Sequence, residues 1–68
     1  MKATIRSTGA TIEAATLKAI RSTLNSMLRI GGPRGLTADT DTGAVIHVEL
    51  YDSQDYIMAA DGRTIYHS

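Results

Sequence analysis

The chain has 68 residues, which is enough for one domain (residues 1–68), and its seven basic and seven acidic residues give a net charge of zero. It contains no cysteine, which excludes disulfides and thiolate metal sites, and its three tyrosines are its only aromatic residues, so an aliphatic core is expected. No apolar run approaches the roughly 20 residues of a membrane span, and the N-terminus lacks the apolar region of a signal peptide, so we expect a soluble, cytoplasmic protein.

The N-terminal segment is expected to form a β-hairpin. Residues 2–7 have the composition of a short strand, and Thr8-Gly9 is a turn signal. Residues 10–14 fit a second strand that pairs back, and they fit equally the first turns of the helix that follows. We favour the hairpin.

The clearest element is a helix that begins after Thr16. Its apolar residues recur on one face of a 3.6-residue period: Leu17, Ile20, Leu24, Met27 and Leu28. Thr16 is a suitable N-cap, because its hydroxyl can accept a hydrogen bond from a free N–H of the first turn. Gly31-Gly32-Pro33 predicts the end of the helix.

The C-terminal part is expected to be a β-meander that follows a long loop. Residues 31–43 are poor in apolar side chains and predict the loop, and residues 44–51, 56–60 and 63–67 predict three strands. Asp61-Gly62 is the strongest hairpin signal. The elements together predict an α+β fold of order β-β-α-β-β-β, with one helix packed on one face of an antiparallel sheet.

No arrangement of residues predicts catalysis. The two histidines, His47 and His67, lie on predicted strands, and no nucleophile-elbow motif accompanies them, so both are expected to be surface residues. Residues 39–43 resemble the start of a calcium loop, but Ala44 and Leu50 stand where that loop requires Gly and Glu. We therefore expect no enzymatic activity, no cofactor and no metal, and a protein that acts by binding another macromolecule.

Charge is distributed unevenly along the chain. Residues 1–38 carry six basic side chains and one acidic one, whereas residues 39–68 carry one basic and six acidic. This asymmetry either marks a surface for a charged partner or is neutralised when the two halves fold together. The candidate partner-binding residues are Lys18, Arg21, Arg29 and Arg34 on the helix side, and Asp39, Asp41 and Tyr51 on the loop and sheet side. For the basic group, a solvated helix flank is the other interpretation.

The outer side of the sheet is a second candidate surface, because tyrosine is favoured at interfaces. The residues assigned to it are His47, Glu49, Tyr51, Tyr56, Met58 and Tyr66. The alternative assignment buries Tyr56 and Met58 and exposes Ile57.

Two short motifs frame the helix and the last hairpin. Ile12-Glu13-Ala14-Ala15-Thr16-Leu17 leads into a helix that contains Arg21, and Asp61-Gly62-Arg63 lies in the meander. With these motifs the chain resembles small phage-encoded anti-CRISPR proteins that inhibit type I-F surveillance complexes. The resemblance implies a non-catalytic inhibitor that binds Cas proteins of a type I CRISPR-Cas effector complex in the host cytoplasm and blocks recognition of target DNA.

The residues alone leave two other functions open. The basic helix flank would suit a small nucleic-acid-binding regulator, whose affinity should fall steeply with salt. Exposed strand edges or the tyrosine face would suit a homo-oligomeric phage structural protein, for example a homodimer.

Overall fold

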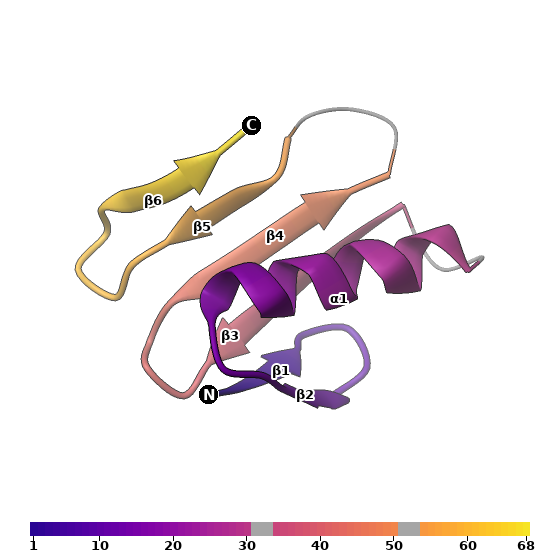
Figure 1. The fold of residues 1–68 in the computed structure, drawn as a ribbon, viewed down its shortest axis with the longest axis horizontal. Helices are drawn as coiled ribbons and strands as arrows, with labels where there is room; N and C mark the ends of the chain where they lie inside the picture. Colours follow the sequence, from indigo (N-terminus) through magenta and orange to yellow (C-terminus); the bar gives the residue numbers. More distant parts are fainter. Residues whose placement is uncertain (31–33, 51–53) are drawn as a thin grey trace.

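The computed structural model describes residues 1–30, 34–50 and 54–68. In chain order the elements are β1 (Lys2–Ile5), β2 (Thr11–Glu13), α1 (Leu17–Arg29), β3 (Gly35–Thr40), β4 (Val45–Glu49), β5 (Tyr56–Met58) and β6 (Thr64–His67). The strands form one antiparallel sheet in the order β2-β1-β3-β4-β5-β6, and α1 lies across one of its faces (Figure 1). The predicted α+β class is confirmed.

The N-terminal hairpin and the helix cap are also confirmed. β1 pairs with β2 so that Lys2 stands opposite Glu13. Thr16 has an extended backbone, and its Oγ1 accepts the N–H of Ala19 at 3.1 Å. α1 ends at Arg29 with Ile30 as its C-cap, and the predicted terminator at residues 31–33 lies outside the described residues. No helix in the described part of the chain is long and apolar enough to cross a membrane.

The segment expected to be a loop contains one of the two central strands of the sheet. β3 pairs with β1 on one side and with β4 on the other, which adds one strand to the expected order. Leu36, Ala38 and Thr40 are buried and alternate with partly exposed residues. The loop prediction is wrong here because pairing on both edges, together with burial of Leu36 and Ala38, outweighs the weak strand preference of Gly, Ala and Asp.

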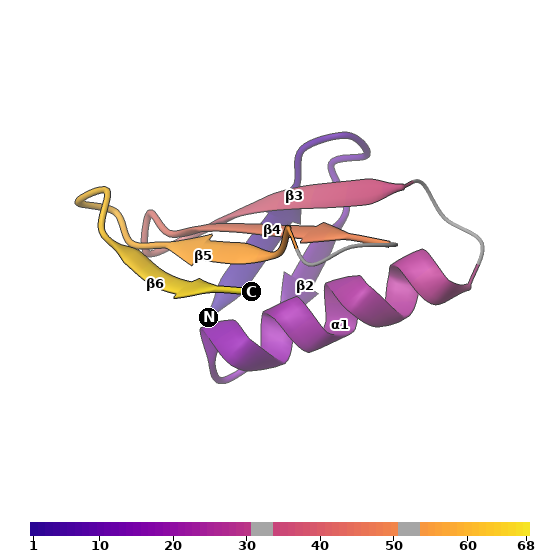
Figure 2. The same cartoon turned by 90° about the horizontal axis from the view of Figure 1, so that it is seen from above.

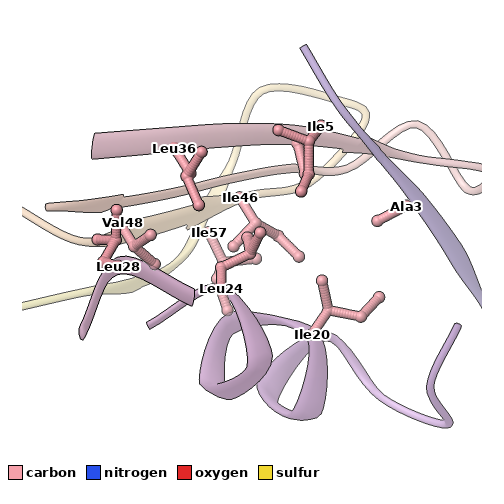
Figure 3. Close-up of a cluster of buried hydrophobic side chains, with 10 residues drawn as sticks. Ala3, Ile5, Ile20, Leu24, Leu28, Leu36, Ile46, Val48 and Ile57 are labelled. Atoms are coloured by element: carbon pink, nitrogen blue, oxygen red, sulfur yellow. The ribbon is translucent and has the colours of Figure 1, made fainter. Parts of the chain in front are cut away.

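The core lies between α1 and the sheet (Figure 3). Ile20, Leu24 and Leu28 come from α1, and all three are at most 2% exposed. The sheet supplies Ala3, Ile5, Leu36, Ala38, Ile46, Val48 and Ile57. Each fully buried Leu or Ile contributes about 1.5–3 kcal/mol relative to an exposed one, so this aliphatic layer is the main source of stability.

Candidate functional site

The sheet face opposite α1 is not covered by any described element (Figure 2). We call it the outer face. Two rows of side chains cross it in register: Thr37, His47, Tyr56 and His67 on β3 to β6, and Thr4, Asp39, Val45 and Met58 on β1, β3, β4 and β5. The rows place polar, aromatic and apolar groups side by side on a surface that is open to a partner.

His47 is the centre of the first row. Its Nδ1 lies 2.7 Å from Thr37 Oγ1, and its Nε2 lies 2.8 Å from Glu49 Oε2. Its ring stacks on Tyr56 with a centroid distance of 5.2 Å and an interplanar angle of 23°. In the neutral ring, an Nε2–H that donates to Glu49 leaves Nδ1 to accept from Thr37, so one tautomer satisfies both contacts.

A glycine lies beside this network, where β3 approaches β4 closely. Gly35 stands opposite Glu49, and a β-carbon at Gly35 would lie 3.1 Å from the Val48 carbonyl oxygen and 3.7 Å from His47 Cε1. A contact of 3.1 Å is tight for carbon and backbone oxygen, so a side chain at Gly35 would push against β4. The distances to the Glu49 and His47 side chains, 3.5 and 3.7 Å, are ordinary van der Waals contacts, so Gly35 serves the close approach of β3 to β4.

Arg6 and Asp39 form an ion pair at the β1 side of the outer face. Arg6 Nε and Nη2 each donate to one carboxylate oxygen of Asp39, and both distances are 2.7 Å. These hydrogen bonds hold the pKa of Asp39 below its ordinary value and raise the pKa of Arg6. Both side chains are about half exposed, at 57% and 47%, so the pair orients two charges on the surface and adds little to stability.

The structure decides between the two assignments of β5. Ile57 is buried, and Tyr56 and Met58 lie on the outer face, which settles a choice that the short strand pattern left open. Tyr66 is a correction, because it stands opposite the buried Ile57 and packs against the core on the α1 side. A break in the β5–β6 register shifts the alternation of side chains in β6, and the sequence pattern does not reveal this.

Thr37, His47 and Glu49 are a hydroxyl, an imidazole and a carboxylate connected in the order of a nucleophilic triad. Such triads act in sites that exclude water and stabilise a developing oxyanion. These groups instead stand on an open strand surface, where the side chains of His47 and Glu49 are 21% and 39% exposed. We therefore interpret the network as one that fixes the shape of the outer face.

On the other side of the sheet, Arg21 is held by groups of this chain. Its Nη2 lies 3.2 Å from Asp55 Oδ2, and its guanidinium stands 4.2 Å above the centre of the Tyr66 ring. Asp55 is 7% exposed, and it also accepts hydrogen bonds from Asn25 Nδ2 and from the Glu49 backbone N–H. Arg21 and Asp55 therefore tie α1 to β4 and β5.

The structure separates the predicted partner-binding residues into two groups. Lys18 and Arg29 are exposed on the flank of α1 that also holds Arg21, and Arg34 follows α1, where its carbonyl accepts the Leu50 N–H. Asp39 lies on the outer face, and Asp41 lies in the β3–β4 turn, where its N–H donates to the Lys2 carbonyl. Tyr51 lies outside the described residues. The basic and acidic candidates thus do not form one surface.

Three residues of these sites escaped the sequence analysis. Arg6 and Thr37 matter because their partners, Asp39 and His47, come from other strands. Asp55 is one of the six acidic residues of the C-terminal half, and nothing in the sequence distinguishes it from the others. A strand prediction for residues 35–40 would have placed Thr37 and Asp39 on one face, but no local signal pairs Arg6 or Asp55 with its partner.

The described residues contain no group of three or more His, Cys, Asp or Glu side chains that could hold a metal ion. No protein-family model, no curated protein and no solved structure matches the chain.

Proposed function

We propose that the chain acts without catalysis, by binding a protein partner through the outer face. The observation that carries this proposal is an open sheet face whose side chains are already fixed by contacts within the protein. His47 is held by Thr37, Glu49 and Tyr56, and Arg6 is held by Asp39 in a two-bond pair. Side chains that are ordered before binding lose less conformational entropy when a partner arrives, which favours affinity.

The composition of the outer face supports a protein partner. Tyr, Met and Arg are enriched in protein interfaces, and Tyr56, Met58 and Arg6 are exposed or partly exposed on this face. Tyrosine adds a large apolar ring and a hydroxyl at low entropic cost. We place Tyr56 at the centre of the binding surface, because it lies between His47 and His67 in the first row.

The proposed partner is a type I CRISPR-Cas surveillance complex. The resemblance of residues 12–17 and 61–63 to anti-CRISPR proteins supports this choice, and with it a stoichiometric inhibitor that contacts Cas proteins in the host cytoplasm and prevents recognition of target DNA. An inhibitor of this kind needs a binding surface and no reaction centre.

The proposal is tested by co-purification followed by a DNA-binding assay. The tagged protein is incubated with a purified type I surveillance complex, and binding of the complex to labelled target DNA is then measured. Tyr56→Ala combined with Asp39→Lys should weaken association about 30-fold, since a central interface tyrosine alone contributes about 2 kcal/mol. Arg29→Glu, on the helix flank at the other side of the molecule, is the matched control and should leave association within about threefold.

Two results would contradict the proposal in different ways. If the wild-type protein associates with no type I complex, the proposed partner is wrong. If the helix-flank variant loses association and the outer-face variant keeps it, the proposed partner is correct but the outer face is not the binding surface. Circular dichroism of both variants confirms that each is folded.

Nucleic-acid binding is a second candidate, favoured by one observation on the helix flank. Arg6, Arg21 and Arg63 each pair with a carboxylate, whereas within the described residues Lys18, Arg29 and Arg34 make no ion pair. Such cations are available to phosphates. Binding of a labelled duplex or single strand at low salt, lost as salt rises, would support this function, and no binding at low salt would eliminate it.

A further inference from the structure

A groove runs between α1 and β6 on the side of the sheet that faces away from the outer face. Its volume is about 300 Å³, and it is lined by Leu17, Lys18, Arg21, Ile57, Ile65 and Tyr66. The floor and walls are mainly apolar. Ile65 is 53% exposed, so a large aliphatic side chain faces water here. α1 packs mainly over β4, with fewer contacts to β2 and β3, which leaves the β6 end of the sheet open.

A β-bulge gives this groove its lining. Ile57 stands opposite Tyr66, but Met58 stands opposite Thr64, so Ile65 is an extra residue in β6. A bulge of this kind interrupts the alternation of side chains. Ile65 and Tyr66 are consecutive, yet both line the groove, whereas a regular strand would direct them to opposite faces.

Arg21 fixes one wall of the groove in place. Its guanidinium covers the Tyr66 ring at 4.2 Å and is held from behind by Asp55 at 3.2 Å. The orientation of Tyr66 is therefore set by contacts that exist before any ligand arrives. A preformed apolar pocket with few polar groups is the usual form of a binding site.

The charges at the groove are all positive. Lys18 and Arg21 are the charged residues of its lining, and Asp55, which pairs with Arg21, is not part of it. Lys18 makes no ion pair within the described residues, and its side chain is exposed. An apolar ligand with a carboxylate beside it would match both the lining and the charge of this groove.

We propose that this groove binds a short peptide segment of a partner protein, in which a leucine-sized side chain fills the groove and an adjacent acidic residue pairs with Lys18. The bulge argues against a second copy of the chain that adds its own strand at β6, because it breaks the regular row of backbone groups on which strand addition depends. The groove and the outer face lie on opposite sides of the sheet, so the two proposals can be tested independently.

The test is an NMR titration of the ¹⁵N-labelled full chain with two tripeptides, N-acetyl-Glu-Leu-Glu-amide and N-acetyl-Lys-Leu-Lys-amide. The acidic peptide should shift the amide signals of Leu17, Ile65 and Tyr66 in a saturable way. Its affinity should exceed that of the basic peptide roughly two- to fivefold, as an exposed ion pair provides. Lys18→Glu should reverse this order, which a purely structural role of Lys18 would not do.

A matched pair of variants tests the apolar part of the site. Ile65→Ser should weaken the acidic peptide roughly fivefold or more, because it removes the aliphatic wall. Ile30→Ser is the control, since Ile30 is 85% exposed and is not part of the groove lining, and it should leave the affinity unchanged. The proposal is overturned if neither peptide gives saturable shifts, or if the preference survives Lys18→Glu. It is also overturned if the groove signals shift on dilution without peptide, which would assign the groove to a second copy.

Discussion

Replacing Asp55 by alanine is expected to destabilise the protein more than any other single carboxylate replacement among the described residues. The Asp55 side chain is 8% exposed, and its carboxylate has three partners, two on α1 and one on β4. Oδ1 accepts the Glu49 N–H at 2.9 Å, and Oδ2 accepts from Asn25 Nδ2 at 3.3 Å and pairs with Arg21 Nη2 at 3.2 Å. Alanine removes all three contacts at once.

The size of the effect follows from these contacts. A hydrogen bond to a charged group contributes about 1.5–3 kcal/mol to stability. We assign this value to the short hydrogen bond from the Glu49 N–H. The two longer contacts contribute less, because the Arg21 side chain is 24% exposed and is partly solvated. We expect a total loss of roughly 2–4 kcal/mol. A domain of 68 residues has a free energy of unfolding of roughly 3–10 kcal/mol, so the variant should lose a large fraction of its stability.

The assay is urea and thermal unfolding followed by far-ultraviolet circular dichroism. The melting temperature should fall by roughly 10–30 °C, at 4–8 °C per kcal/mol for a domain of this size. Asp55→Asn keeps an oxygen that can accept from the Glu49 N–H, so its loss of stability should be about half that of Asp55→Ala. Asp61→Ala removes a side chain that is 58% exposed and pairs with the exposed Arg63, so its effect should stay within about 1 kcal/mol. Equal losses for Asp55→Ala and Asp61→Ala would refute the role given to Asp55.

Two further predictions concern the core and the outer face. Leu24 is fully buried, so Leu24→Ala should lower the free energy of unfolding in urea by about 3–5 kcal/mol. Ile30 is 85% exposed, so Ile30→Ala should lower it by less than about 0.5 kcal/mol. Similar losses for the two variants would show that Leu24 is not in the core. Arg6→Gln should raise the pKa of Asp39 toward its ordinary value, measured by NMR titration of the carboxyl carbon. Because the folded-state pKa of Asp39 is lowered, any stability that the pair adds is present above about pH 4 and is lost as the pH falls through that pKa. If the pKa of Asp39 is the same in Arg6→Gln, Arg6 is not the cause of the lowered pKa.

The elements that could be predicted from the sequence are those with a strong local signal. The apolar period of α1, the Thr16 cap and the Asp61-Gly62 turn each depend on residues close together in the chain. β3 could not be predicted in this way. Its buried side chains are small apart from Leu36, and its Gly, Thr and Asp residues are typical of turns. It is a strand because β1 and β4 supply partners on both edges, and that information is not local.

The candidate sites were predictable only as sets of residue types. The alternation in β4 correctly assigned His47 and Glu49 to the outer face, since a strand period of two needs no partner to be recognised. The basic period of α1 correctly put Lys18, Arg21 and Arg29 on one flank. The sequence could not show that Arg21 is bound by Asp55, because the two residues meet only when α1 packs against the sheet. The bulge that moves Tyr66 to the helix side has no local marker either.

The strand order has a consequence for how the chain folds. Each neighbouring pair in the described sheet joins strands that follow one another along the chain, except β1 and β3, where Ala3 meets Thr40. The sheet is therefore two hairpin-built blocks with a single long-range seam, and α1 belongs to the first block but buries its apolar side against the second. Folding is slowed when a long loop must close, at a cost in chain entropy, before the favourable contacts between its ends can form. The first 30 residues should thus stay unfolded on the ribosome until β3 and β4 emerge, and closure of the β1–β3 seam should be the step that commits the chain to its native state.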